Sequence, residues 1–164
     1  EVAEKRGRIC CGDYTRQLPE KLKAGGSVLV EGPYGQFNFQ GKKEDQIWVA
    51  GGIGITPFIS RMQELAGSSQ HNQIDLFYST DVPDDRFLES VIKSAEQANI
   101  NLHLITPKTD RRVDTDLITR VVPEWKKADV WFCGPAKFGE SIKNNFNRLG
   151  VGTENFHQEL FEMR

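Results

Sequence analysis

The chain has 164 residues, of which 38% are hydrophobic and 27% are charged, and its formal net charge is −2. That length is enough for one sizeable hydrophobic core. Lys and Arg form no block, and no apolar run approaches the roughly 20 residues that span a bilayer, so the composition argues against a nucleic-acid-binding protein and against a membrane-spanning segment.

Residues 1–40 predict an incomplete domain. Residues 6–11 and 27–31 are candidate strands, and the second runs into the turn cluster Gly32-Pro33-Tyr34-Gly35. Two or three strands cannot close a barrel, so we expect this part to need further partners. Thr15, between the two strands, is either the N-cap of a short turn or part of a second phosphate site.

The three cysteines are Cys10, Cys11 and Cys133. Adjacent cysteines on a strand point to opposite sides, and no C-x-x-C or His-rich spacing accompanies them. We therefore expect no metal or iron–sulfur site, and buried, reduced thiols.

A polar segment, residues 41–45, is predicted to be the linker, and the stretch that follows it organises the rest of the chain. Residues 47–50 form a short apolar run typical of a strand buried on both faces, and the glycine-rich turn Gly51-Gly52-Ile53-Gly54-Ile55 comes next. Thr56 is predicted to be a helix N-cap and Pro57 the first helical residue.

This strand, turn and helix indicate an anion site of the dinucleotide type, with the spacing G-x-G-x-x-P. We expect Gly52 and Gly54 to permit positive φ and to let a phosphate approach bare N–H groups. The alternative is a tight turn that binds nothing. No G-x-x-x-x-G-K-[ST] sequence occurs, so a P-loop is excluded.

After the first helix, strands alternate with helices to the end of the chain. The expected strands are 74–78, 102–105, 130–133 and 155–161, and the expected helices are 86–98, 116–122 and 137–149. This alternation predicts an α/β domain over residues 46–164 with a five-stranded parallel, Rossmann-like sheet. The expected strand order is 3-2-1-4-5, with the glycine turn at the switch point.

Five motifs in order resemble the ferredoxin–NADP reductase superfamily. They are Gly12-x-x-Thr15, Gly32-Pro33-x-Gly35, Gly51-Gly52-Ile53-Gly54-Ile55-Thr56-Pro57, Cys133-Gly134-Pro135 and Phe156-x-x-Glu159-x-Phe161. The resemblance covers the C-terminal remnant of a flavin-binding β-barrel and a whole NAD(P)-binding domain. The ending Phe156-His157-Gln158-Glu159-Leu160-Phe161 looks most like the flavocytochrome branch, which contains ferric reductases and NADPH-oxidase-like proteins.

The resemblance implies a role for each matching residue. Gly52, Gly54, Ile55, Thr56 and Pro57 would hold the pyrophosphate of the nicotinamide cofactor, and Thr15 that of FAD. Cys133, with Gly134 and Pro135, would lie beside the nicotinamide ring, and Glu159 and Phe161 would lie at its junction with the flavin. The alternatives are a packed core cysteine and an end strand packed on the sheet. The Arg-x-Tyr-Ser flavin signature of the superfamily is absent, so we expect an incomplete FAD site.

The segment after the second strand bears on the choice of cofactor. Ser79 and Arg86 suit the 2′-phosphate of NADPH, whereas Asp81 suits the free 2′-hydroxyl of NADH. Asp81, Asp84 and Asp85 can equally form a solvated loop and a helix cap. We favour NADPH.

Together these features predict the reductase module of a flavoprotein, which accepts hydride from NAD(P)H onto FAD and passes electrons to a haem or another one-electron acceptor. The alternatives are a soluble oxygenase-type flavin reductase and a non-catalytic nucleotide-sensing module. We expect the chain itself to be soluble on the cytoplasmic side and inactive without a flavin barrel before Glu1. The resemblance also implies a parent protein that carries a haem-bearing transmembrane domain in the plasma membrane.

Overall fold

The computed structural model describes residues 17, 20–29, 37–68, 72–81, 84–106 and 112–161. The chain divides into two compact units, Glu1–Gln36 with Arg164, and Phe37–Met163. In the first unit, the predicted strand 6–11, Thr15 and the turn cluster 32–35 lie outside the described residues. Residues 27–29, which we predicted to begin a strand, form none.

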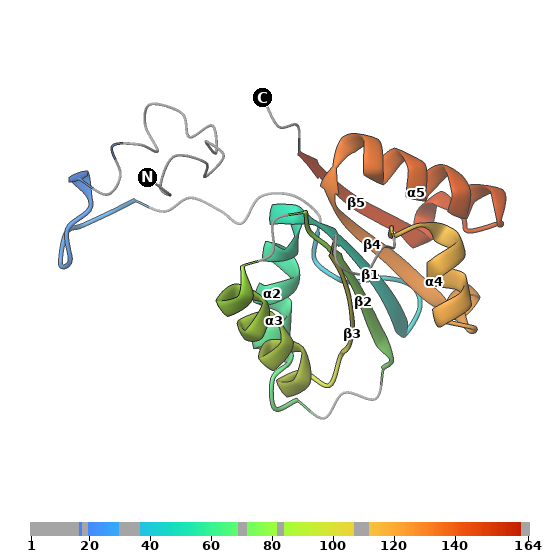
Figure 1. Ribbon diagram of the computed structural model, residues 1–164, viewed down its shortest axis with the longest axis horizontal. Helices are drawn as coiled ribbons and strands as arrows, with labels where there is room; N and C mark the ends of the chain where they lie inside the picture. The colour runs from blue at the N-terminus through green and yellow to red at the C-terminus, as the bar shows by residue number, and fades with distance from the viewer. Residues whose placement is uncertain are drawn as a thin grey trace. The chain divides into compact units, whose positions relative to one another are not determined.

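The second unit is built on a five-stranded parallel sheet (Figure 1). Its strands are β1 (Asp45–Gly51), β2 (Ile74–Ser79), β3 (Asn101–Ile105), β4 (Ala128–Pro135) and β5 (Phe156–Phe161). Every pair of neighbours is parallel, and the order is β3-β2-β1-β4-β5. The predicted fold class and strand order are confirmed.

Helices connect the strands and cover both faces of the sheet (Figure 1). They are α2 (Thr56–Leu65), α3 (Asp85–Gln97), α4 (Thr115–Val121) and α5 (Ala136–Arg148), and 3₁₀ turns span Gly52–Ile55, Trp125–Lys127 and Thr153–Asn155. Each predicted helix is present within one residue of its expected bounds. Asn155, which we assigned to the last strand, instead ends a 3₁₀ turn.

Alternating residues of β1 supply the centres of two hydrophobic clusters. Trp48 and Ala50 belong to the cluster that includes residues of α2 and α3, whereas Ile47 and Val49 belong to the one that includes residues of α4 and α5. All four are fully buried, as predicted for a strand covered on both faces.

The segment before β1 is attached to this unit. The rings of Phe39 and Trp48 lie 4.9 Å apart between centroids, and Phe37 packs against the same cluster. The backbone N–H of Lys43 donates to Oδ2 of Asp129 (2.8 Å), so the predicted linker is anchored on β4. The assignment of residues 1–40 to a flavin barrel stays a prediction.

A close approach between the glycine turn and the end of β4 fixes the carboxyl edge of the sheet. Gly52 has φ of 55°, which favours glycine. Gly54 is buried, and a Cβ added there would lie 2.9 Å from the nitrogen of Gly134 and closer still to the carbonyl of Cys133. The missing side chain of Gly54 therefore lets two backbone segments touch.

We predict that Gly54→Ala destabilises this unit by roughly 1–3 kcal/mol, because overpacking against rigid backbone forces a shift. Thermal unfolding followed by circular dichroism measures the effect. Ser60→Ala, on the exposed side of α2, is the control and should change the stability little. A Gly54→Ala variant as stable as that control would show that the contact is loose.

Candidate functional site

A cavity of about 450 Å³ lies at the carboxyl ends of the central strands. Its lining residues are Ile53, Thr56, Pro57, Cys133, Glu159 and Leu160. The chain leaves β1 towards β2 on one side, and β4 pairs with β1 on the other, so this cavity is at the switch point of the sheet. Ligands of open α/β sheets bind at such points.

The residues that the glycine turn exposes to a ligand are only partly those we predicted. Gly52 is exposed and Ile53 is 65% exposed, whereas Gly54 and Ile55 are buried and Ile55 is only 1% exposed. The backbone of β4 occupies the space that a side chain of Gly54 would fill, and the role of Gly54 in holding a phosphate stays a prediction. Ile53 was missed, although its place between the two glycines is a usable signal.

Thr56 is in the site, but it does not cap the helix as predicted. A 3₁₀ turn runs directly into α2, so Ile55 already has helical angles (φ −69°, ψ −22°) and Thr56 is the first helical residue. Its hydroxyl donates to the carbonyl of Ile53 (3.1 Å). An ionised phosphate only accepts hydrogen bonds, so this hydroxyl would have to turn away from Ile53 to bind one.

Cys133 and Glu159 form the opposite wall. They are direct neighbours in the β4–β5 register, and Cys133 also pairs with Ala50 of β1. Cys133 is 5% exposed, so it is both a core residue and part of the cavity lining. Burial, and then the nearby charge of Glu159, raise the pKa of the Cys133 thiol to about 11. The thiol is therefore neutral at physiological pH, which excludes a thiolate nucleophile here.

Gly134 and Pro135, which follow the strand predicted for residues 130–133, are the end of β4 and pair with Leu160 and Phe161. Pairing with β5 extends the strand two residues beyond the predicted end. The side chain of Phe161 and all of Thr15 lie outside the described residues, so their roles stay predictions. Leu160 lines the cavity and was not predicted.

The residues expected to select the cofactor lie away from this cavity. Ser79 pairs with Gly51, so it lies beside the start of the glycine turn. Arg86 is exposed in the first turn of α3. Asp84 caps α3, its Oδ1 accepting from the N–H of Phe87 (3.0 Å), which confirms the structural alternative for that residue.

Within the described residues, no group of three or more His, Cys, Asp or Glu side chains is arranged to hold a metal ion. No helix in the same part of the chain is long and apolar enough to cross a membrane.

Residues 48–144 match the model of the oxidoreductase NAD-binding domain family. The carnitine monooxygenase reductase subunit of Escherichia coli K12 is 27% identical over 150 residues, which cover 90% of this chain and 44% of that protein. Flavohemoprotein B of Dictyostelium discoideum is 24% identical over 162 residues, covering 92% of this chain and 38% of that protein. The chain thus spans less than half the length of these relatives.

Among solved structures, the FAD/NAD-binding domain of nitric oxide dioxygenase from Vibrio cholerae is similar, with a TM-score of 0.71 and 20% identity. The match covers 96% of this chain and 68% of that one, and it supports the fold alone. The family match spans more than half of the chain and includes the glycine turn, α2 and Cys133. The chain therefore belongs to the oxidoreductase NAD-binding domain family.

Proposed function

We propose that this chain is the nicotinamide-binding part of a flavin reductase. One observation carries the proposal: a single cavity at the switch point brings the exposed glycine turn together with Cys133 and Glu159. Its volume of about 450 Å³ is within the range of small-molecule pockets, so it can take one end of a dinucleotide.

The residues present fit a nicotinamide dinucleotide. The N-terminus of α2 favours negative charge, and the exposed backbone of Gly52 and Ile53 lies in the turn just before it. Cys133 presents a small, neutral wall, and the carboxylate of Glu159 at the rim can accept a hydrogen bond from an amide. When bound, NAD(P)H would supply a hydride and FAD would accept it; the chain's own residues bind and orient.

The flavin half of the proposal depends on residues beyond the cavity. Thr15 and Phe161 remain the candidates for FAD contact, and a complete flavin barrel would be the partner of this chain. The relatives named above are an oxygenase reductase subunit and a flavohemoprotein. They favour the oxygenase-type reductase, or a haem acceptor in a flavohemoprotein-like setting, as the destination of the electrons. A ferric-reductase-like acceptor in a membrane-bound parent remains our proposal from the sequence motifs alone.

We predict that anaerobic NADPH bleaches the yellow absorbance of an FAD-loaded protein in which this chain is joined to a complete flavin barrel, and that Ile53→Asp weakens NADPH binding at least about tenfold. A carboxylate at this exposed position would repel the pyrophosphate, and losing charge-assisted contacts costs about 1.5–3 kcal/mol. Calorimetry measures the binding, and stopped-flow absorbance measures the bleaching.

Leu149→Asp, at another exposed apolar residue, is the matched control and should bind NADPH normally. Binding without bleaching would favour the nucleotide-sensing alternative. Equal NADPH affinity in the Ile53→Asp and control variants would remove the glycine turn from the site.

We also predict that Cys133 resists alkylation. Its pKa of about 11, against an ordinary value of 9.0, lowers the thiolate fraction at pH 8 by about 100-fold. Peptide mapping after iodoacetamide treatment should find Cys133 labelled far more slowly in the folded than in the unfolded chain. The rate should keep rising with pH up to about pH 11, because only the thiolate reacts. Rapid labelling at pH 8 would contradict a buried, neutral thiol.

For cofactor choice, we predict that Arg86→Ala weakens NADPH at least about tenfold and leaves NADH nearly unchanged, because the guanidinium would pair with the 2′-phosphate. Lys93→Ala, an exposed cation further along α3, is the control. Equal effects of Arg86→Ala on the two cofactors would instead support NADH as the cofactor, with Asp81 as the residue that selects it.

A further inference from the structure

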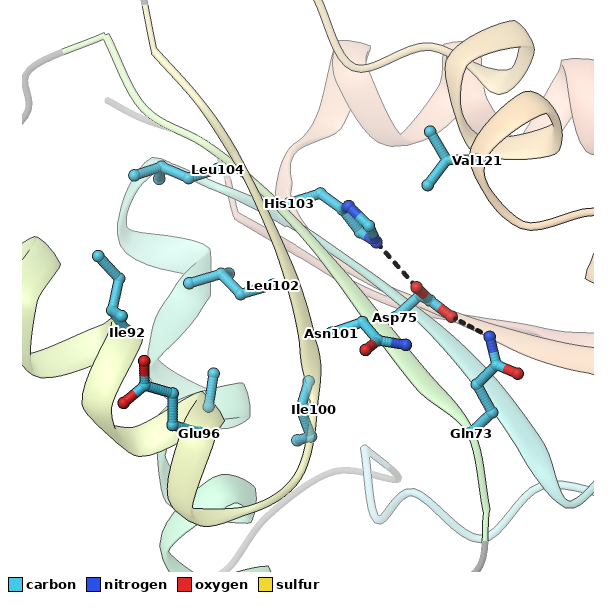
Figure 2. Close-up of a pocket in the computed structure, with 11 residues that line it drawn as sticks. Gln73, Asp75, Ile92, Glu96, Ile100, Asn101, Leu102, His103, Leu104 and Val121 are labelled. Carbon is cyan, nitrogen blue, oxygen red and sulfur yellow. Dashed lines mark hydrogen bonds and ion pairs between the residues drawn. The ribbon is translucent and has the colours of Figure 1, made fainter.

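Strand β3 forms one edge of the sheet, and a groove follows it. Among the described residues, β3 pairs with β2 and with no other strand. A cavity of about 690 Å³ lies around the edge (Figure 2). Its lining comes from β3 and the residue before it, from the start of β2 and the residue before it, from α3 and from the end of α4.

The two sides of β3 differ in character. Leu102 and Leu104 point towards Ile92 on α3, and both pack against the first hydrophobic cluster (Figure 2). His103 points the other way, towards Asp75, with its Nε2 2.8 Å from Oδ1 of that residue. A strand that extends the sheet here would meet mainly apolar side chains on the α3 side, with Glu96 as the exception, and mainly polar ones on the α4 side, with Val121 as the exception.

Among the described residues, the main-chain groups of β3 that do not face β2 belong to Leu102 and Leu104. The carbonyl of Ile105 accepts from the N–H of Thr80 (3.2 Å), so Ile105 faces β2. Because the hydrogen-bonding direction alternates along a strand, His103 also faces β2, and Leu102 and Leu104 face outwards. Two N–H and two C=O groups are thus presented at the edge.

The edge lacks the usual protection against pairing. Natural edge strands commonly carry Lys or other charged residues, or Pro, yet Asn101-Leu102-His103-Leu104-Ile105 contains none of them except the titratable His103. Two large apolar side chains flank it instead, Ile92 at 40% and Val121 at 39% exposure.

We propose that β3 pairs antiparallel with β3 of a second copy of this chain, about a two-fold axis at His103. In this register Leu102 lies opposite Leu104 of the second copy, as a hydrogen-bonded pair that uses the outward-facing groups of both residues. Residues directly opposite point to the same face, so all four leucines gather on the α3 side. The strand itself has the alternation that the groove requires, which is why a second copy is the occupant.

The charges within β3 permit this pairing, while Glu96 of α3 adds one carboxylate to the groove. No carboxylate or ammonium lies within β3, so self-pairing sets no such like charges opposite each other. His103 meets its own copy, but each ring is held by its own Asp75. Burial raises the pKa of Asp75, yet hydrogen bonds from His103 and Gln73 outweigh it, and the net pKa is lowered. Asp75 stays ionised and compensates any charge on His103.

Sedimentation velocity from low to several hundred micromolar chain tests this proposal. We expect a reversible monomer–dimer equilibrium that Ile92→Lys weakens at least about tenfold, since it replaces an apolar contact with a cation in both copies. Leu149→Lys, the same kind of change at a distant exposed site, should leave the equilibrium unchanged. A chain that stays monomeric throughout, or a dimer insensitive to Ile92→Lys, would overturn the proposal.

A disulfide scan tests the register. Residues opposite each other in a non-hydrogen-bonded antiparallel pair have Cα atoms about 4.5 Å apart, within the roughly 4.4–6.8 Å that a disulfide spans. With Cys10 and Cys11 replaced by Ser, His103→Cys should therefore oxidise to a covalent dimer. Asn101→Cys, two residues from the axis, is too far from its own copy and should not. Circular dichroism confirms folding. The register would be overturned if a folded His103→Cys chain formed no crosslink, or if the His103→Cys and Asn101→Cys chains crosslinked equally.

Discussion

The close contact between the turn after β1 and the last residues of β4 is the constraint on which the candidate site depends. Because Gly54 has no side chain, the 3₁₀ turn can lie directly on the backbone of Cys133 and Gly134. That contact sets Ile53 and Thr56 across from Cys133, and the register of β5 then adds Glu159 to the same wall. The same contact therefore determines both the packing of the sheet edge and the access of a ligand. A substitution at Gly54 would change the stability of the domain as well as ligand binding.

This contact also explains what sequence reasoning could reach. The buried runs of β1 and β4 and the amphipathic helices between strands are strong patterns, so element order and topology followed from the sequence. The role of Gly54 did not, because a missing Cβ can make room for a ligand or for a neighbouring backbone, and only the fold decides which. The prediction that Thr56 is the N-cap failed for a local reason. The residue before it is already helical, so the threonine cannot occupy the cap position.

The candidate site was predicted in part for similar reasons. Thr56 and Pro57 were expected at the pyrophosphate, and Cys133 and Glu159 at the nicotinamide end of the same cofactor. All four line one cavity. Leu160 was missed because an exposed apolar residue has no distinguishing pattern in a sequence, whereas Ile53 could have been found from its place between two glycines. The protonation state of Cys133 depends on burial and on Glu159, which is 26 positions further along the chain and becomes a neighbour only through the β4–β5 register. The predicted strand order already placed residues 102–105 at an edge of the sheet, but which of these residues face outwards depends on the β2–β3 register, which the sequence did not give.

The two proposals meet at the carboxyl end of β2. Ser79 pairs with Gly51 on one side and with Ile105, the last residue of β3, on the other. Two strands, β3 and β2, would thus separate an added strand from β1 and its glycine turn, and three strands would separate it from Cys133 on β4. The nicotinamide end of a bound cofactor would remain clear of the second copy. The adenosine end, which the dinucleotide fold directs to the end of β2, would lie nearer to it. Any coupling between self-association and cofactor binding should therefore act through adenosine and 2′-phosphate recognition, and should leave the geometry around Cys133 and Glu159 unchanged.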